Sequence, residues 1–395
     1  MSNSKYRFDW QAANRFELLI DGPQFFPAML ADINNAQHYI LLEMYLTNPG
    51  HVSQRFFSAL IAAAQRGVTT YVLLDDFGSR AITANQRQSL LDQGVHLAIY
   101  NPLLTSKYTL MLFRDHRKLL VVDDLVAYVG GAALSDELDH PDTPQHNWRE
   151  NMVRIEGENV AQWQQLFCAT WSQWSIVVLP VFTMHVSNDA LQRGRVTMTQ
   201  GPSLLEIKRS FLNNVRRAKR CVWFCTAYFA PSRKLRRSLC AAASRGVDVR
   251  ILIPGTITDN QMSRYLAQSY YAELLNQGVR IFEYQPRFLH AKLVLCDDWV
   301  SIGSCNVDRW NFLWNLDANQ EIDDVQFSAR IVEMFKQDFI DSREILYQDW
   351  RDRSLITRLK IAFWAQYVHI ADIFFNNLGI IRYWQKLRKS VHKSP

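Results

Sequence analysis

The sequence lacks the cysteine arrangement of a structural zinc site. Its six cysteines are scattered through apolar surroundings, and only Cys221 and Cys225 lie close together. No second pair of Cys or His residues at a comparable spacing completes a set of four ligands. We therefore predict no metal site, and six reduced thiols fit the redox conditions of the cytosol.

Signals for export are also missing. The N-terminal residues MSNSKYRFDWQAANRFELLI do not show a basic start, an apolar stretch and a small-residue cleavage site in succession. A secretory signal peptide needs these three parts. We therefore expect that the protein is not exported.

The body of the chain lacks an excess of positive charge. The net charge is +6, but residues 351–395 contain nine Lys or Arg residues and two acids, a net charge of +7. The preceding 350 residues therefore sum to −1. A nucleic-acid groove needs a basic face on the globular part of the protein, so we expect no nucleic-acid partner. The basic tail indicates that it meets something anionic.

Two halves of the chain repeat each other. LIAAAQRGVTTYVLLDD (60–76) aligns with LCAAASRGVDVRILIPG (239–255), LLDQGVHLAIYNP (90–102) with LLNQGVRIFEYQP (274–286), and HRKLLVVDD (116–124) with HAKLVLCDD (290–298). The three matches occur in one order and at a nearly constant offset. We conclude that the chain contains a duplicated domain.

Each copy alternates predicted strands and helices. Buried-strand runs such as YILLEMYL (39–46) precede helices that end on a glycine, as at Gly67. This alternation predicts a mostly parallel sheet with helices on both faces. The fold class is therefore α/β. We expect two α/β/α sandwich domains, residues 1–190 and 191–350, related by a pseudo-twofold axis and followed by an amphipathic helical tail, residues 351–395.

The residues that can carry chemistry form one motif, present in both copies. The motif H-x-K-x4-D comprises His116, Lys118 and Asp123 in the first copy and His290, Lys292 and Asp297 in the second. Residues two apart in a strand point to the same side, so each imidazole projects beside an ammonium. Two such pairs around one anion suit a phosphodiester. One histidine attacks phosphorus, the other protonates the leaving oxygen, and the lysines neutralise the remaining oxygens.

The lysines supply the positive charge that metal ions supply in other phosphoryl-transfer sites, so we expect no cofactor. A single histidine on a strand is more often a satisfied core residue than a catalytic one. Here the same spacing occurs twice, at the same point of a duplicated domain and each time before a turn that contains glycine. This repetition favours the catalytic interpretation.

At these residues the sequence resembles the phospholipase D superfamily, in which the motif continues as G-[GS]-x-N. The second copy has Gly303, Ser304, Cys305 and Asn306, whereas the first has Gly130 and Gly131 but Ala133 at the position of the Asn. The resemblance implies that Gly130, Gly131, Ser304 and Asn306 bind the phosphate or orient the site, and Ala133 removes one donor. It also implies an acid that orients each histidine, for which Glu150 and Asp317 are the candidates.

Within the superfamily, residues 14–46, 227–255 and 290–322 resemble bacterial cardiolipin synthases, in particular the kind called cardiolipin synthase B. The resemblance covers about residues 14–350, without the pair of N-terminal transmembrane helices of many such enzymes. It implies transfer of a phosphatidyl group between two phosphatidylglycerol molecules, giving cardiolipin and glycerol through a phosphohistidine. The order in many relatives makes His116 the nucleophile and His290 the general acid.

Several alternatives remain open. Phosphatidylethanolamine could be the donor, or water the acceptor, which would make the protein a phospholipid hydrolase. A nuclease of the same fold would keep the same catalytic residues, but the charge of the body argues against it. An inactive membrane scaffold is favoured only by Ala133.

The tail carries a pattern of its own. Apolar residues recur at steps of three and four, as Ile356, Leu359, Phe363, Tyr367, Ile370, Phe374, Leu378 and Ile381. Polar residues such as Lys360 and Asp372 interrupt this run too often for a spanning helix. The basic residues Arg382, Lys386, Arg388, Lys389 and Lys393 follow it.

Such a helix is expected to lie in a membrane interface with its basic end on anionic lipid. This would place the protein peripherally on the cytoplasmic side of the inner membrane. The alternative is a C-terminal helix that packs on the body.

Overall fold

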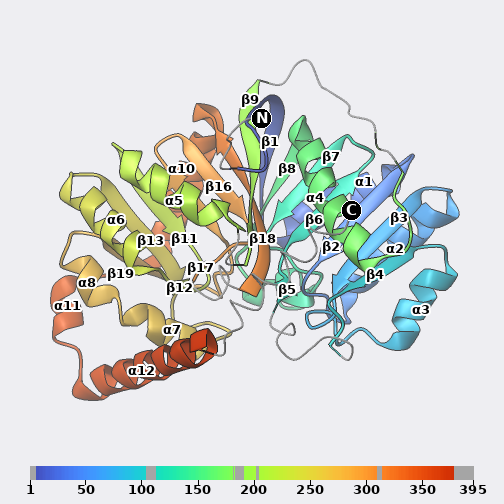
Figure 1. Ribbon diagram of the computed structural model, residues 1–395. Helices are drawn as coiled ribbons and strands as arrows, with labels where there is room; N and C mark the ends of the chain where they lie inside the picture. Colours follow the sequence, from blue (N-terminus) through green and yellow to red (C-terminus); the bar gives the residue numbers. More distant parts are fainter. Residues whose placement is uncertain are drawn as a thin grey trace.

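The computed structural model describes residues 6–103, 113–180, 182, 191–201, 204–308 and 314–377, with side chains of the last helix described to Tyr367. Two sheets with the same strand order lie side by side (Figure 1). In the first, the order is β4 (His96–Tyr100), β3 (Thr69–Asp75), β2 (Tyr39–Met44), β6 (Lys118–Val122), β7 (Val126–Gly130), β8 (Asn151–Gly157) and β1 (Gln11–Ile20). In the second, it is β14 (Arg280–Tyr284), β13 (Asp248–Pro254), β11 (Cys221–Cys225), β15 (Leu293–Cys296), β16 (Trp299–Gly303), β18 (Asn315–Asp323) and β9 (Gln192–Gln200). The repeated order confirms the duplication.

The two sheets form one continuous sheet because β1 pairs with β9. Beyond β14, the strand β19 (Ser342–Ile345) forms the outer edge of the second half. Within each half, only the first three strands of the order are parallel to one another. The sheet of each half is therefore mixed rather than mostly parallel. Tight turns at Asp123 and Asp297, both with φ of +55°, send β7 and β16 back antiparallel.

Helices cover both faces of each sheet, as the α/β/α prediction requires. On one face of the first half lie α1 (Gly22–Asn35) and α2 (His51–Gln65), and α3 (Ala84–Asp92) follows β3. Their counterparts in the second half are α5 (Glu206–Arg217), α6 (Arg233–Ser244), α7 (Gln261–Gln268) and α8 (Tyr271–Leu275). The opposite faces carry α4 (Asn159–Trp174) and α10 (Val325–Ile340).

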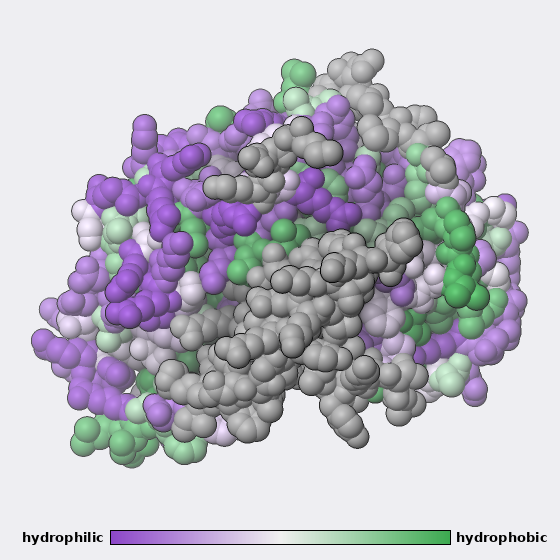
Figure 2. Space-filling view, viewed as in Figure 1, coloured by the Kyte–Doolittle hydropathy of each residue, from purple (hydrophilic) through white to green (hydrophobic). Residues whose placement is uncertain are grey.

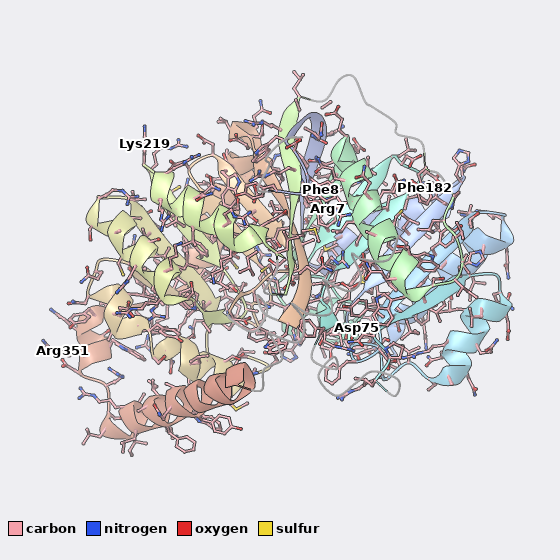
Figure 3. All side chains as sticks on the ribbon, in the orientation of Figure 1. Arg7, Phe8, Asp75, Phe182, Lys219 and Arg351 are labelled. Carbon is pink, nitrogen blue, oxygen red and sulfur yellow. The ribbon has the colours of Figure 1, made fainter. Side chains whose placement is uncertain are left out.

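One apolar core is shared by the two halves. It combines Trp163 and Trp171 of α4 with Phe327 and Phe335 of α10 and with side chains from both sheets. Phe8, which Figure 3 labels next to Arg7 close to α4, is also part of this core. The shared core fixes the two halves relative to each other, and therefore the two copies of the motif as well.

The chain continues through α11 (Tyr347–Arg351) into α12 (Leu355–Asn377), which packs along α7 and inserts Ile361 into the core of the second half. The predicted tail helix therefore exists as far as Asn377. The predicted apolar positions beyond Tyr367 and the basic residues from Arg382 onward lie outside the described side chains. No helix in the described ranges is both long enough and apolar enough to cross a membrane.

Candidate active site

Each copy of the motif is held against the other half of the molecule. The short strand β5 (Arg114–Asp115) pairs in parallel with β18 of the second half, and the His116 N–H donates to the Leu316 carbonyl at 2.9 Å. In the same way, the His290 N–H donates to the Arg149 carbonyl at 2.8 Å. The two histidines therefore both stand at the junction between the halves.

A buried carboxylate from the opposite half orients each imidazole. Asp317 Oδ1 lies 2.9 Å from His116 Nδ1, and Glu150 Oε2 lies 2.6 Å from His290 Nδ1. Both carboxylates are fully buried. A carboxylate that accepts a hydrogen bond from Nδ1–H selects the tautomer whose Nε2 carries a lone pair. The arrangement thus leaves Nε2 of each ring available for chemistry.

The two lysines of the motifs act on one another and on both imidazoles. Lys118 Nζ donates to the His116 carbonyl at 2.6 Å, and Lys292 Nζ donates to the His290 carbonyl and lies 3.6 Å from Glu150 Oε2. Burial, followed by the charge of Lys292, lowers the pKa of Lys118 to about 7. Burial also lowers the pKa of Lys292. The two ammonium groups, one from each half, therefore share a single site.

The histidines are neutral in the empty site, and Glu150, the partner of His290, is charged. Burial, with the charge of Lys118, lowers the pKa of His116, and burial with Lys292 lowers that of His290 to about 3. Burial alone would raise the pKa of Glu150, but Lys292 and His290 outweigh it and lower it to about 2. Neutral imidazoles among buried ammonium groups are suited to nucleophilic attack on an anionic substrate.

The residues that follow the two motifs help to position the carboxylates of Glu150 and Asp317. A Cβ on Gly131 would lie 2.2 Å from Glu150 Oε2, so only glycine lets that carboxylate reach His290. At the equivalent position of the second half, the Ser304 hydroxyl donates to Asp317 Oδ1 at 2.7 Å. A Cβ on Gly130 would lie 2.5 Å from the Asn151 carbonyl, which keeps β7 close to β8. Gly131 and Ser304 therefore position the carboxylates, and Gly130 allows the close approach of two strands.

The fourth predicted orienting residue, Asn306, is buried beside Thr226, whose Oγ1 lies 3.5 Å from Asn306 Oδ1. Ala133 instead belongs to the apolar core under α1 and α2. Replacing the amide by a methyl group therefore leaves no unpaired polar group at Ala133. The departure from the superfamily pattern is compensated by packing.

The two aspartates of the motif do not reach the imidazoles. Asp123 accepts hydrogen bonds from the backbone N–H groups of Gln37, His38 and Tyr39, at 2.6–2.8 Å. Asp297 does the same for Lys219, Arg220 and Cys221, at 2.8–3.0 Å. Each lies at the far end of a strand, on the order of 15 Å from its lysine at about 3.3 Å per residue. This corrects the expectation that they are catalytic, since they anchor the neighbouring strand.

Aromatic rings that the sequence did not single out cover the imidazoles. Tyr45 meets His116 edge-on, with 4.9 Å between ring centroids, and the Lys118 ammonium lies 5.1 Å from the Tyr45 ring. Trp148 lies 4.9 Å from His290, and Phe288 lies 5.7 Å from it. By strand register, the position of Tyr45 in the first half is equivalent to that of Ala227 in the second. Because the residue is not repeated, comparing the two copies could not identify Tyr45.

The described residues contain no group of three or more His, Cys, Asp or Glu side chains that could hold a metal ion. The site thus provides two neutral imidazoles, each oriented by a carboxylate, and two ammonium groups around one position. This set can bind a phosphodiester, form a bond to its phosphorus and protonate the leaving oxygen.

Comparisons with known proteins agree with this geometry. The family model described as "Cardiolipin synthase, PLD-like domain" matches residues 29–171 and 211–339. The chain is 31% identical to the major cardiolipin synthase ClsA of Bacillus subtilis over 88% of this chain and 73% of that one. It is 34% identical to cardiolipin synthase A of Pseudomonas putida GB-1 over 88% and 73% of the two chains. It is 30% identical to the minor cardiolipin synthase ClsB of Bacillus subtilis over 87% and 85%.

Relatives named cardiolipin synthase A and relatives named cardiolipin synthase B match at similar identity, so the resemblance to cardiolipin synthase B in particular stays a prediction. Among solved structures, the phosphatidylserine synthase of Haemophilus influenzae shares the fold, with a TM-score of 0.67, 13% identity, and coverage of 92% of this chain and 94% of that one. The match of the family model to most of the duplicated body, together with these identities, establishes that the chain belongs to the cardiolipin synthase family of PLD-like proteins.

Proposed function

We propose that the protein synthesises cardiolipin by transferring a phosphatidyl group from one phosphatidylglycerol to the terminal hydroxyl of another, with release of glycerol. The observation that carries this proposal is the reciprocal pairing of two imidazoles with buried carboxylates of the opposite half. A single phosphodiester between them has a nucleophile on one side and an acid on the other. Transfer then proceeds in two displacements.

In the first displacement, His116 Nε2 forms a bond to phosphorus, and the bond from phosphorus to the glycerol oxygen breaks. His290 gives its proton to that oxygen, and glycerol leaves. In the second, the hydroxyl of a new phosphatidylglycerol gives its proton to His290 and bonds to phosphorus, while the P–N bond to His116 breaks. Lys118 and Lys292 neutralise the non-bridging oxygens throughout.

Substrate binding favours the protonated form of His290. In the empty site Lys292 disfavours the imidazolium, but a bound phosphodiester brings a negative charge that offsets this ammonium. The Glu150 carboxylate, which stays ionised, then stabilises the imidazolium. Substrate binding therefore produces the acid form of His290.

Transfer to a lipid hydroxyl requires that water be kept from the phosphohistidine. Tyr45, Trp148 and Phe288 cover the imidazoles with aromatic surface, which supports transfer over hydrolysis. An ordinary hydrolase would have no need for this shielding. The finer choice of donor between phosphatidylglycerol and phosphatidylethanolamine rests on the family membership alone.

We further propose that α12 docks the protein peripherally on an anionic membrane, on the cytoplasmic side of the inner membrane. Ile361 turns toward the body, but the predicted stripe of apolar residues turns outward: Ile356, Leu359, Phe363 and Tyr367 are each more than half exposed. Figure 2 shows apolar surface where this helix begins, at the lower left. An exposed apolar stripe with basic residues after it is suited to a lipid interface.

Product analysis tests the proposed reaction. Purified protein is incubated with phosphatidylglycerol vesicles that carry a label in the glycerol headgroup, and with an oligonucleotide in a parallel reaction. We expect equal amounts of cardiolipin and free glycerol, and an intact oligonucleotide. Phosphatidic acid as the main product would identify a hydrolase, and cleaved oligonucleotide a nuclease. No product, with a folded protein, would favour the inactive scaffold.

A further inference from the structure

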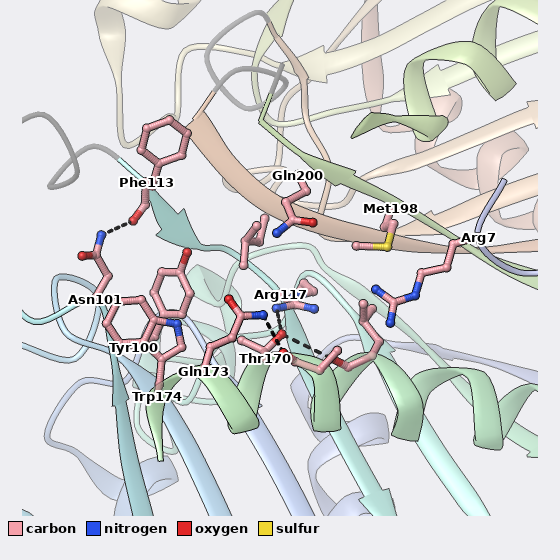
Figure 4. A pocket seen from close by; sticks show the side chains of 13 residues that line it. Arg7, Tyr100, Asn101, Phe113, Arg117, Thr170, Gln173, Trp174, Met198 and Gln200 are labelled. Atoms are coloured by element: carbon pink, nitrogen blue, oxygen red, sulfur yellow. Dashed lines mark hydrogen bonds between the residues drawn. The ribbon is translucent and has the colours of Figure 1, made fainter. Parts of the chain in front are cut away.

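A cavity of about 120 Å³ lies beside α4 (Figure 4). It is on the side of the segment from β5 to β6 that faces away from the imidazoles. Side chains alternate along the chain here, so Arg117 points toward α4 while His116 and Lys118 point to the other side. Arg7, Arg117, Thr170, Gln173 and Leu316 contribute to the lining. An occupant of this cavity is therefore separate from the reacting phosphate.

The lining contains two guanidinium groups and no carboxylate. Arg117 uses Nε and Nη2 to contact Asp115, Glu43 and Thr170, which leaves Nη1 without a hydrogen bond within the described part of the chain. The guanidinium of Arg7 likewise donates no hydrogen bond to a described residue. Both cations thus offer N–H groups to an occupant, although Arg117 is almost entirely buried.

The electrostatics of the cavity favour an anion. Burial, followed by the charge of Arg117, lowers the pKa of Arg7, which shows that the two cations act on each other. Asp115 and Glu43 both contact Arg117 from outside the lining, and burial raises the pKa of Glu43 well above its ordinary value. Glu206, which lies outside the lining, accepts a hydrogen bond from the backbone N–H of Arg7, and its charge acts to raise the pKa of the Arg7 guanidinium. An anion between the two guanidinium groups would relieve their repulsion.

We propose that this cavity binds a phosphate group, supplied either by a small soluble phosphoester or by the headgroup of an anionic phospholipid. Its volume of about 120 Å³ leaves room for one phosphate group. Guanidinium groups bind phosphate oxygens through paired N–H donors. Apart from the two arginines, the wall has uncharged polar residues and is otherwise aromatic or aliphatic; the uncharged polar residues are Asn101, Thr170, Gln173 and Gln200.

Calorimetric titration of the full chain with inorganic phosphate, in a neutral detergent, tests the proposal. The wild type is expected to bind two equivalents, one between the two lysines and one in the cavity. Arg7→Gln and Gln173→Met should each weaken the second equivalent at least tenfold while far-UV circular dichroism shows an unchanged fold. Lys292→Met should remove the first equivalent only. Arg15→Gln, an exposed arginine on β1, removes the same charge elsewhere and should retain both equivalents.

A single equivalent in the wild type that Lys292→Met abolishes, or two equivalents that survive in both cavity variants, would overturn the proposal. The readout does not depend on which lipid the enzyme uses, so it can fail or succeed independently of the proposed reaction. Competition identifies the source of the phosphate. Displacement of the second equivalent by glycerol phosphate alone indicates a soluble phosphoester, and displacement by dihexanoyl phosphatidylglycerol indicates a lipid headgroup.

Discussion

Asp317 follows His116 by 201 residues in the chain, yet its Oδ1 lies 2.9 Å from His116 Nδ1. Glu150 and His290 form the reciprocal contact, also between the halves. Neither half of the duplication orients its own histidine. The junction between the halves is therefore part of the catalytic apparatus, and the shared core that fixes it supports activity as well as stability.

The first prediction concerns the charge of Asp317. Its Oδ2 is buried with no hydrogen-bond partner among the described residues, so Asp317→Asn can place its amide nitrogen there and keep both bonds to Oδ1. Only the negative charge is lost. We expect kcat to fall by about 10²-fold or more, within the range that general acid–base catalysis contributes. Steady-state assays with phosphatidylglycerol measure this, and Asp323→Asn, at the exposed end of the same strand, should change kcat little.

The second prediction concerns the space that Gly131 provides. Gly131→Ala places a Cβ about where Glu150 Oε2 lies, so the carboxylate must leave His290. We expect an activity loss on the order of 100-fold with a folded protein, because His290 loses its orienting partner. Ser304→Ala, at the equivalent position, removes one hydrogen bond and should cost only about fivefold, near 1 kcal/mol. Equal losses in the two variants would contradict the different roles of Gly131 and Ser304.

Much of this site was predictable from the sequence, because duplication doubles every functional signal. The histidines, lysines and the two acids were identified from repeated spacing and from the superfamily pattern. The exchange of acids between halves was not, since it depends on the pairing of β5 with β18, a contact between distant segments. The anchoring role of Asp123 was missed because the motif gives spacing only, and the left-handed turn that aims its carboxylate at Gln37 appears only in three dimensions.

The buried polar groups behind His116 were also unpredictable. Glu43, Asp115 and Arg117 form an ion network in the first half, whereas strand register places Cys225, Leu289 and Ala291 at the equivalent positions of the second. Comparing the two copies could suggest only that these positions differ. That Glu43 and Arg117 meet requires the pairing of β2 with β6.

The third prediction concerns pH. The pKa of Lys118 is lowered to about 7 in the empty site, so the fraction of free enzyme with a charged Lys118 decreases as the pH rises through that value. Because this charge binds the phosphodiester, kcat/KM should fall above about pH 7. In Lys118→Arg the guanidinium stays charged, so the fall should move to higher pH even if the maximum is lower. Profiles of kcat/KM that coincide after scaling would exclude Lys118 as the titrating group.

The fourth prediction concerns membrane docking by α12. Deleting residues 355–395 should weaken binding to anionic vesicles and leave the fold of the body intact. Replacing both Leu359 and Phe363, exposed by 70% and 64%, with Glu should weaken binding by more than about 100-fold, since burying each such side chain is worth about 1.5–3 kcal/mol.

Vesicle cosedimentation measures this binding. Val325→Glu, an equally exposed apolar residue at the start of α10, serves as the matched control and should bind like the wild type. If the deletion leaves binding unchanged, α12 is a structural helix, and another surface must meet the lipid.

The last prediction concerns which histidine is the nucleophile and which is the general acid. Radiolabelled phospholipid should leave a label on the protein that survives denaturation in base and is lost in acid, as for a phosphohistidine. His116→Ala should abolish this label, because the proposed first displacement forms its bond to phosphorus at His116 Nε2. His290→Ala should retain some label with a donor whose leaving group needs no proton, since the first displacement then requires no acid.

The physical basis for this division lies in the neighbours of each ring. A histidine bonded to phosphorus is held by that bond and tolerates the apolar Ala133, whereas the acid must keep its orientation through two proton transfers. His290 stands in the half that keeps Asn306 buried in place, and its contact to Glu150, at 2.6 Å, is the shorter of the two. Label that persists in His116→Ala and disappears in His290→Ala would reverse the two roles, while leaving the reciprocal pairing of acids and imidazoles as the basis of catalysis.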